Sequence, residues 1–120
     1  MSQRDPLVAF RHMLDHAKEA TGMLARKKRS EFAGDRILVL AVTRLLEIIG
    51  EAAGRIPRQT QEGFPRIQWT SIYGMRNRII HGYDNINMEI VWNVVKNDLP
   101  LLIGELEAIV RGSEKDGPGT

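Results

Sequence analysis

Apolar residues recur every three or four positions along most of the chain, which is the period of an α-helix. The first such segment is preceded by Asp5 and Pro6, a pair typical of a helix N-cap and first helical position. The segment ends in a basic run, residues 26–29, where cations suit a helix C-terminus. Its apolar seam consists of Leu7, Phe10, Leu14, Ala17, Thr21 and Leu24. The pattern predicts a helix from Pro6 to the basic run.

The second segment carries two adjacent apolar stripes, so we expect a central helix that is covered on more than one side. Ser30 is its expected N-cap, and the helix should run from Glu31 to about Arg55. Gly50 and Gly54 lie four residues apart, which indicates close approach of another helix, within the monomer or across a dimer. One stripe is Ile37, Ala41, Leu45, Ile48, Ala52 and Ile56; the other is Leu38, Val42, Leu46, Ile49 and Ala53.

Residues 57–66 contain two prolines and a glycine and are predicted to form a loop. Helical spacing resumes near Ile67 and ends at Gly82. A last helix follows, capped by Asn85 or Asn87, and Pro100 must kink or split it because proline lacks an amide. We therefore predict an all-α fold, an antiparallel bundle of four to five helices over residues 1–111, with a disordered tail at 112–120.

Composition narrows the possible functions. The 120 residues include no cysteine, which excludes a disulfide scaffold, a thiolate metal site and a cysteine nucleophile. The formal charge of +2 is too small to indicate nucleic-acid binding by itself. No apolar run is long enough to span a membrane, and the charged N-terminal residues do not resemble a secretory signal. A cytoplasmic location is the resulting expectation.

Candidate chemistry is concentrated in one short stretch around His81. Gly82 fits the position that stops a helix, so His81 is expected in the last helical turn with Arg78 beside it. Arg76 lies about 140° around the axis, so both can reach one substrate at a helix crossing or in a site completed by a second copy. Histidine changes charge near neutral pH, as a general acid or base must, and a guanidinium suits a phosphate that gains charge. Together these groups suffice for RNA cleavage without a metal, in which the base activates the ribose 2′-hydroxyl.

The stretch resembles the R-x4-H-x-Y motif of the HEPN superfamily, specifically that of the HepT-like toxins. Here the motif reads Arg76, Asn77, Arg78, Ile79, Ile80, His81, Gly82 and Tyr83. The resemblance covers roughly residues 5–110 and extends to the flanks, in the family's order: Ile49-Gly50-Glu51-Ala52, Trp69 with Gly74-Met75-Arg76-Asn77, Val91-Trp92, and Leu99-Pro100.

The resemblance implies a toxin of a toxin–antitoxin system, a metal-independent endoribonuclease that acts as a homodimer with two motif copies facing one cleft. Arg76 and His81 would be the catalytic pair, supported by Asn77 and Arg78. The partner would be an MntA-type minimal nucleotidyltransferase antitoxin that transfers AMP from ATP to Tyr83 and silences the toxin. No other cofactor and no metal is implied. The alternatives are a non-catalytic subunit that dimerises and docks the nucleotidyltransferase, and a helical adaptor whose motif only caps a helix.

Other polar groups carry weaker signals. His12 and His16 share a helix face at zinc-ligand spacing, but no third ligand is evident, so they are interpreted as a surface pair. The basic run at 26–29 could contact RNA phosphates or be a solvated helix end. Glu47 and Glu51 lie off the main stripes and are expected in salt bridges to Arg44, Arg55 or the motif arginines, with Glu51 able to orient Arg76 or Arg78.

Overall fold

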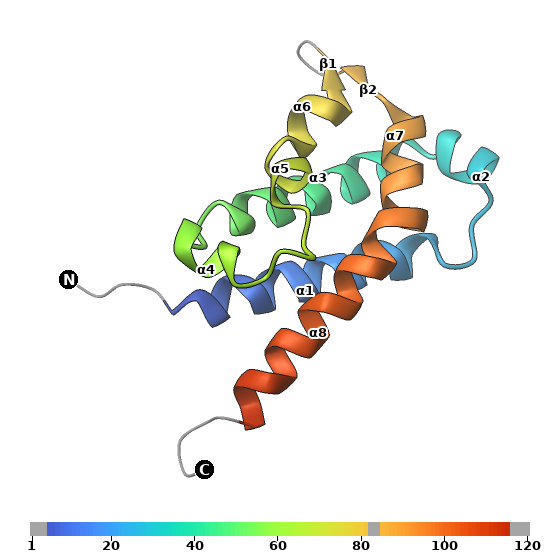
Figure 1. Ribbon diagram of the computed structural model, residues 1–120. Helices are drawn as coiled ribbons and strands as arrows, with labels where there is room; N and C mark the ends of the chain where they lie inside the picture. Colours follow the sequence, from blue (N-terminus) through green and yellow to red (C-terminus); the bar gives the residue numbers. More distant parts are fainter. Residues whose placement is uncertain (1–4, 82–84, 116–120) are drawn as a thin grey trace.

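The computed structural model describes residues 5–81 and 85–115 (Figure 1). Three long helical segments and several short helices form the body, together with one two-stranded ribbon, so the all-α prediction is confirmed. The elements are α1 (Pro6–Leu24), α2 (Arg29–Ala33), α3 (Arg36–Ala53), α4 (Arg58–Glu62), α5 (Trp69–Tyr73), α6 (Met75–Ile79), β1 (Ile80–His81), β2 (Asn85–Ile86), α7 (Met88–Asn93), the π-helix η1 (Val94–Asp98) and α8 (Leu99–Lys115). In the described ranges, no helix has the length and apolar character needed to cross a membrane.

Helix α1 begins as predicted, because the Asp5 carboxylate accepts a hydrogen bond from the Leu7 amide at 2.9 Å. Its C-terminus differs from the prediction. The helix ends at Leu24, before the basic run, and its last turn holds no basic residue. The cation at this end is instead Lys96 from η1, whose Nζ donates to the Leu24 carbonyl at 2.6 Å.

The central helix is shorter than predicted, and Ser30 is not its N-cap. Ser30 lies inside the separate helix α2, where the Glu31 carboxylate accepts from the Lys28 amide at 2.7 Å. Helix α2 ends at Ala33, with Gly34 as its C-cap. Helix α3 starts at Arg36, and the Asp35 carboxylate accepts a hydrogen bond from the Leu38 amide at 3.0 Å. The glycine and the aspartate cap therefore divide the segment into two helices, although its apolar spacing predicts one continuous helix.

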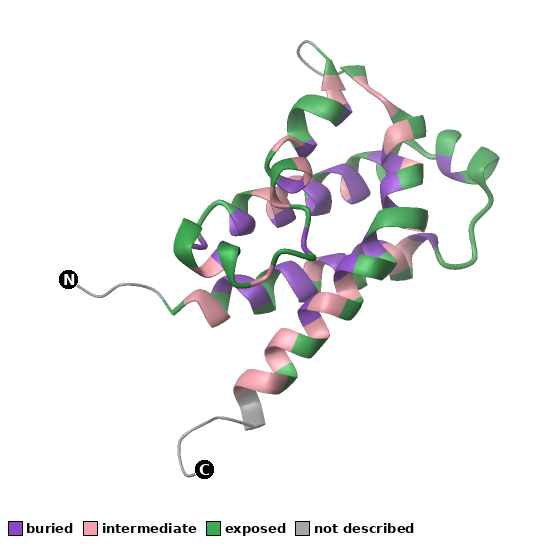
Figure 2. Cartoon of the chain, viewed as in Figure 1, coloured by how far each residue is buried: buried purple, intermediate pink, exposed green. Residues whose placement is uncertain are grey.

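The core lies between α1 and α3 and continues under α5, α6 and the last helical segment (Figure 2). The stripe that contains Val42, Leu46 and Ile49 is buried. The other stripe is exposed only at its start, since Ile37 is 81 % exposed whereas Leu45 and Ile56 are buried. The N-terminal half of α3 thus leaves an apolar face uncovered in the monomer.

Gly50 allows α5 to approach α3 closely. A Cβ built on Gly50 would lie 3.0 Å from the Ile72 carbonyl oxygen, and one on Gly54 would lie 3.6 Å from the Tyr73 ring. Of the two open alternatives for these glycines, the structure supports close approach within the monomer. The predicted loop between α3 and α5 contains α4, and its buried Gln61 donates to the Ile56 carbonyl and to the Tyr73 hydroxyl.

Pro100 interrupts the last helix, as predicted, and the interruption is a π-helix. The Leu99 amide bonds to the Val94 carbonyl, one residue further back than in an α-helix, directly before the residue that lacks an amide. Asn87 is the N-cap of this segment, with its side chain accepting from the Ile90 amide at 3.1 Å. Helix α8 continues to Lys115, so residues 112–115 of the tail that was predicted to be disordered are helical, and residues 116–120 lie outside the described residues.

Candidate active site

The motif stretch changes from helix to strand between its arginine and its histidine. Helix α6 ends at Ile79, and Ile80 is extended, with φ −108° and ψ 123°. His81 lies in β1, which pairs antiparallel with β2, and the Asn87 amide donates to the Ile79 carbonyl at 2.7 Å. The prediction that His81 occupies the last helical turn beside Arg78 is therefore wrong. Two successive β-branched isoleucines and a pairing strand favour the extended backbone. Gly82 and Tyr83 lie outside the described residues.

Arg76 is held by a carboxylate from the central helix. Its Nε lies 3.5 Å from Glu47 Oε2, and the Arg76 side chain is 74 % exposed while that of Glu47 is only 17 % exposed. Glu47 Oε1 lies 3.8 Å from Arg44 Nη1, which also lies 3.2 Å from Glu51 Oε2. The predicted salt bridges of both glutamates are confirmed. The residue that contacts Arg76 is Glu47, however, and Glu51 contacts Arg44 instead.

This arrangement fixes one edge of the Arg76 guanidinium. The contact is made through Nε, so the Nη group on the opposite side of the planar guanidinium remains available to a ligand. A side chain anchored on one edge and exposed on the other is suited to bind a phosphate of a large substrate, because part of its rotamer entropy is already lost.

His81 is exposed on the two-stranded ribbon. It pairs in register with Asn85, and Ile80 pairs with Ile86. Residues that lie directly opposite in an antiparallel pair project from the same face. His81 and Asn85 therefore share one face of the ribbon, and the two isoleucines share the other.

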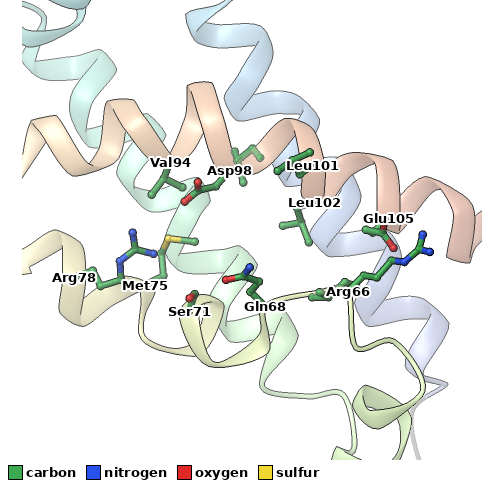
Figure 3. Close-up of a pocket in the computed structure, with 12 residues that line it drawn as sticks. Arg66, Gln68, Ser71, Met75, Arg78, Val94, Asp98, Leu101, Leu102 and Glu105 are labelled. Carbon is green, nitrogen blue, oxygen red and sulfur yellow. The ribbon is translucent and has the colours of Figure 1, made fainter.

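Asn77 and Arg78, the predicted supporting residues, are both exposed on α6. Arg78 lines a recess of about 460 Å³ between α5–α6 and η1–α8 (Figure 3). Arg76 does not line this recess, since residues two apart on a helix project about 200° from each other. The recess has an apolar floor and a charged rim that contains Arg66, Arg78, Asp98 and Glu105. It is separate from the Arg76–Glu47 contact.

The weaker candidates lie away from the motif. His16 Nδ1 donates to the His12 carbonyl at 2.6 Å, as in a surface pair on α1. Within residues 5–81 and 85–115, no three side chains of metal-ligand type are grouped. Arg29 pairs with Glu89 at 3.1 Å, which joins the end of the basic run to α7.

Comparison with known proteins places these residues in a family context. The family model described as "Ribonuclease HepT-like" matches residues 13–109, which include the whole stretch from Arg76 to Tyr83. A Methanocaldococcus jannaschii protein named "Putative RNase" is 34 % identical over 109 residues, which cover 91 % of this chain and 100 % of the relative. A Thermococcus cleftensis protein named "Probable ribonuclease HepT" is 38 % identical over 79 residues, 66 % of this chain and 72 % of the relative. No solved structure matches.

Proposed function

Because the chain belongs to the HepT-like ribonuclease family, we propose that it is an endoribonuclease that cleaves RNA with Arg76 and His81 and needs no metal ion. The observation that carries this assignment of residues is the contact between Arg76 and Glu47 at 3.5 Å. It holds an exposed guanidinium at the start of the segment that leads directly into the ribbon bearing His81.

The reaction follows from the two side chains. The neutral His81 imidazole removes the proton of a ribose 2′-hydroxyl, and the 2′-oxygen attacks the adjacent phosphorus. Arg76 stabilises the charge that develops on the phosphate oxygens. The bond to the 5′-oxygen breaks, and the imidazolium returns a proton to that oxygen. The products are a 2′,3′-cyclic phosphate and a 5′-hydroxyl, and DNA is spared because it lacks the nucleophile.

We extend the proposal to a homodimer formed through the uncovered face of α3. Ile37 is 81 % exposed and Leu40 is 45 % exposed, and the same helix face continues, at spacings of three and four, into Arg44, Glu47 and Glu51. A second copy that covers the apolar end would bring the Arg76–Glu47 contact to the edge of the interface. Two motif copies would then border one cleft.

Regulation by a partner completes the proposal. Tyr83 follows His81 by two residues in the sequence. Transfer of AMP from ATP to the Tyr83 hydroxyl, with release of pyrophosphate, would add an anionic phosphate and a nucleotide beside the catalytic histidine. An MntA-type nucleotidyltransferase antitoxin is the proposed donor, and the chain would act as the toxin of the pair.

The test is RNA cleavage by the purified protein in EDTA, with the intact mass of every sample recorded. We expect wild-type protein to cleave and His81→Ala and Arg76→Ala to lose cleavage while keeping the helical circular dichroism spectrum. His12→Ala and Arg66→Ala are matched controls, because each removes the same type of side chain away from the motif. They should cleave as wild type does.

Each outcome has a defined meaning. Equal cleavage by His81→Ala would refute the catalytic assignment. Wild-type protein of unmodified mass that cleaves no RNA would favour the non-catalytic subunit. An added mass of AMP on inactive protein would mean that it was isolated silenced, and Tyr83→Phe should then lack the adduct.

A further inference from the structure

A second recess lies beside the ribbon that carries His81. Its volume is about 330 Å³, near the lower end of the roughly 300–1,000 Å³ typical of small-molecule sites, which suits one nucleobase with part of its ribose. One wall comes from the junction of α2 and α3, and the other comes from β2 and the start of α7. The lining residues are Ala33, Gly34, Arg36, Val39, Asn85, Ile86 and Met88.

The strand register connects this recess to the catalytic histidine. Asn85 lines the recess and is the cross-strand partner of His81. Opposed residues of an antiparallel pair share a face and have Cβ atoms only about 5 Å apart. A ribose whose 2′-hydroxyl contacts His81 therefore has an adjacent nucleotide within reach of Asn85.

The lining groups fit a base better than a phosphate. The Asn85 amide offers one acceptor and two donors, and an asparagine amide pairs in bidentate fashion with adenine. Met88, 40 % exposed, supplies an apolar contact for one face of a flat ring. The planar guanidinium of Arg36 can stack on a base, and it forms no ion pair with any residue of the described ranges.

The larger recess near Arg78 is a poorer RNA site. Its rim sets two carboxylates, Asp98 and Glu105, against its two arginines. Among the residues that the structure describes, those lining the smaller recess include one cation and no carboxylate. A polyanion is therefore repelled less by the recess beside His81.

We propose that the recess lined by Arg36, Asn85 and Met88 binds an adenine base that flanks the scissile phosphate, so that the enzyme selects its cleavage site by base. This inference rests on the proposed ribonuclease function for its biological meaning. Asn85 reads the base edge, and Arg36 and Met88 hold its faces.

The test measures binding in the His81→Ala background, where RNA stays intact. Fluorescently labelled ribo-oligonucleotides that differ only in one central base, within a uridine hexamer, are titrated and followed by anisotropy. We expect the adenine oligonucleotide to bind about tenfold more tightly than the other three, the discrimination typical of one good bidentate contact.

Variants separate the two parts of the recess. Asn85→Asp removes the amide donors and should shift the preference from adenine to cytosine, whose amino group an aspartate accepts. Arg36→Gln should weaken binding of all four oligonucleotides and keep their order. Ser71→Ala, in the larger recess, is the matched control and should change neither property. Thermal melting confirms that each variant is folded, and Arg36→Gln remains informative if Asn85→Asp is not folded.

Equal affinity for all four bases in the His81→Ala protein would overturn the proposal. So would an adenine preference that survives Asn85→Asp, or an affinity unchanged by Arg36→Gln. Cleavage by wild-type protein is scored separately. Base-selective binding by protein of unmodified mass that cleaves no RNA would refute the ribonuclease mechanism and support the recess. Cleavage with equal affinity for all four bases would support the ribonuclease mechanism and refute the recess.

Discussion

The close approach of α5 to α3 at Gly50 leads to a prediction for Gly50→Ala, with Gly104→Ala as its control. Both glycines lie inside long helices. A Cβ at Gly104 meets no atom within 4 Å, whereas one at Gly50 meets the Ile72 carbonyl oxygen at 3.0 Å. The same methyl group is thus added to the same backbone conformation, once in open space and once against a neighbouring backbone.

The expected change in the free energy of unfolding is the sum of two opposing contributions. Replacing glycine by alanine within a helix stabilises it by about 1 kcal/mol. At Gly104 we expect this gain alone. At Gly50 the oxygen is nearer than the 3.4 Å that most Cβ contacts exceed, so α5 must move by a few tenths of an ångström. Such overpacking costs about 1–3 kcal/mol. Because the helix gain cancels between the variants, their stabilities should differ by about 1–3 kcal/mol.

The assay is thermal unfolding followed by circular dichroism at one fixed protein concentration, since dimerisation would make the Tm depend on concentration. For a chain of 120 residues, 1 kcal/mol corresponds to about 4 °C. Gly104→Ala should melt above wild type, and Gly50→Ala should melt about 4–12 °C below Gly104→Ala. The Gly50 variant should also lose cleavage activity, because α5 leads directly into α6. Equal stabilisation by both substitutions would refute the close-approach argument.

Three further outcomes are expected. Glu47→Gln should lower the kcat of RNA cleavage by about tenfold or more with KM little changed, because Arg76 loses its carboxylate partner. Glu51→Gln, measured in the same steady-state assay, should leave kcat unchanged. Ile37→Asp should produce a monomer in sedimentation experiments and lose cleavage, whereas Leu101→Asp, at a residue 75 % exposed, should leave the oligomeric state unchanged. Lys96→Met should lower stability by about 1 kcal/mol in thermal melting, because it removes the charged 2.6 Å donor of the Leu24 carbonyl, which then keeps only the Lys27 amide at 3.1 Å.

The long helices could be predicted because their apolar spacing and their caps agree. Asp5 and Pro6 mark the start of α1, and Pro100 marks the interruption of the last helix. The start of α3 was missed because the apolar spacing continues across Gly34, and only the pair Gly34 and Asp35 records the break. A glycine followed by an aspartate was the available signal, since it supplies both a helix end and the next N-cap.

The local geometry of the candidate site could not be predicted from the sequence. The spacing of Arg76 and His81 was interpreted as helical, but pairing with β2 takes His81 out of the helix. Two-residue strands leave almost no alternation in a sequence, so periodicity could not reveal them. Both Glu47 and Glu51 were expected to pair with arginines, but Glu51 was favoured as the partner of Arg76 and the structure has Glu47 there, because either glutamate of α3 was compatible with the helix face. The choice between them depends on how α6 crosses α3, which is a tertiary property.

The change from helix to strand at Ile80 has a consequence for insertions and deletions within the motif. A ribbon repeats every two residues, so adding one residue between Ile79 and His81 would turn the imidazole to the opposite face, where Ile80 and Ile86 now lie. Adding two residues would return it to the side of Asn85. Variants with an odd number of residues inserted between Ile79 and His81 should therefore be inactive, and variants with an even number should be active. A continuous helix would instead rotate the histidine by about 100° for each added residue.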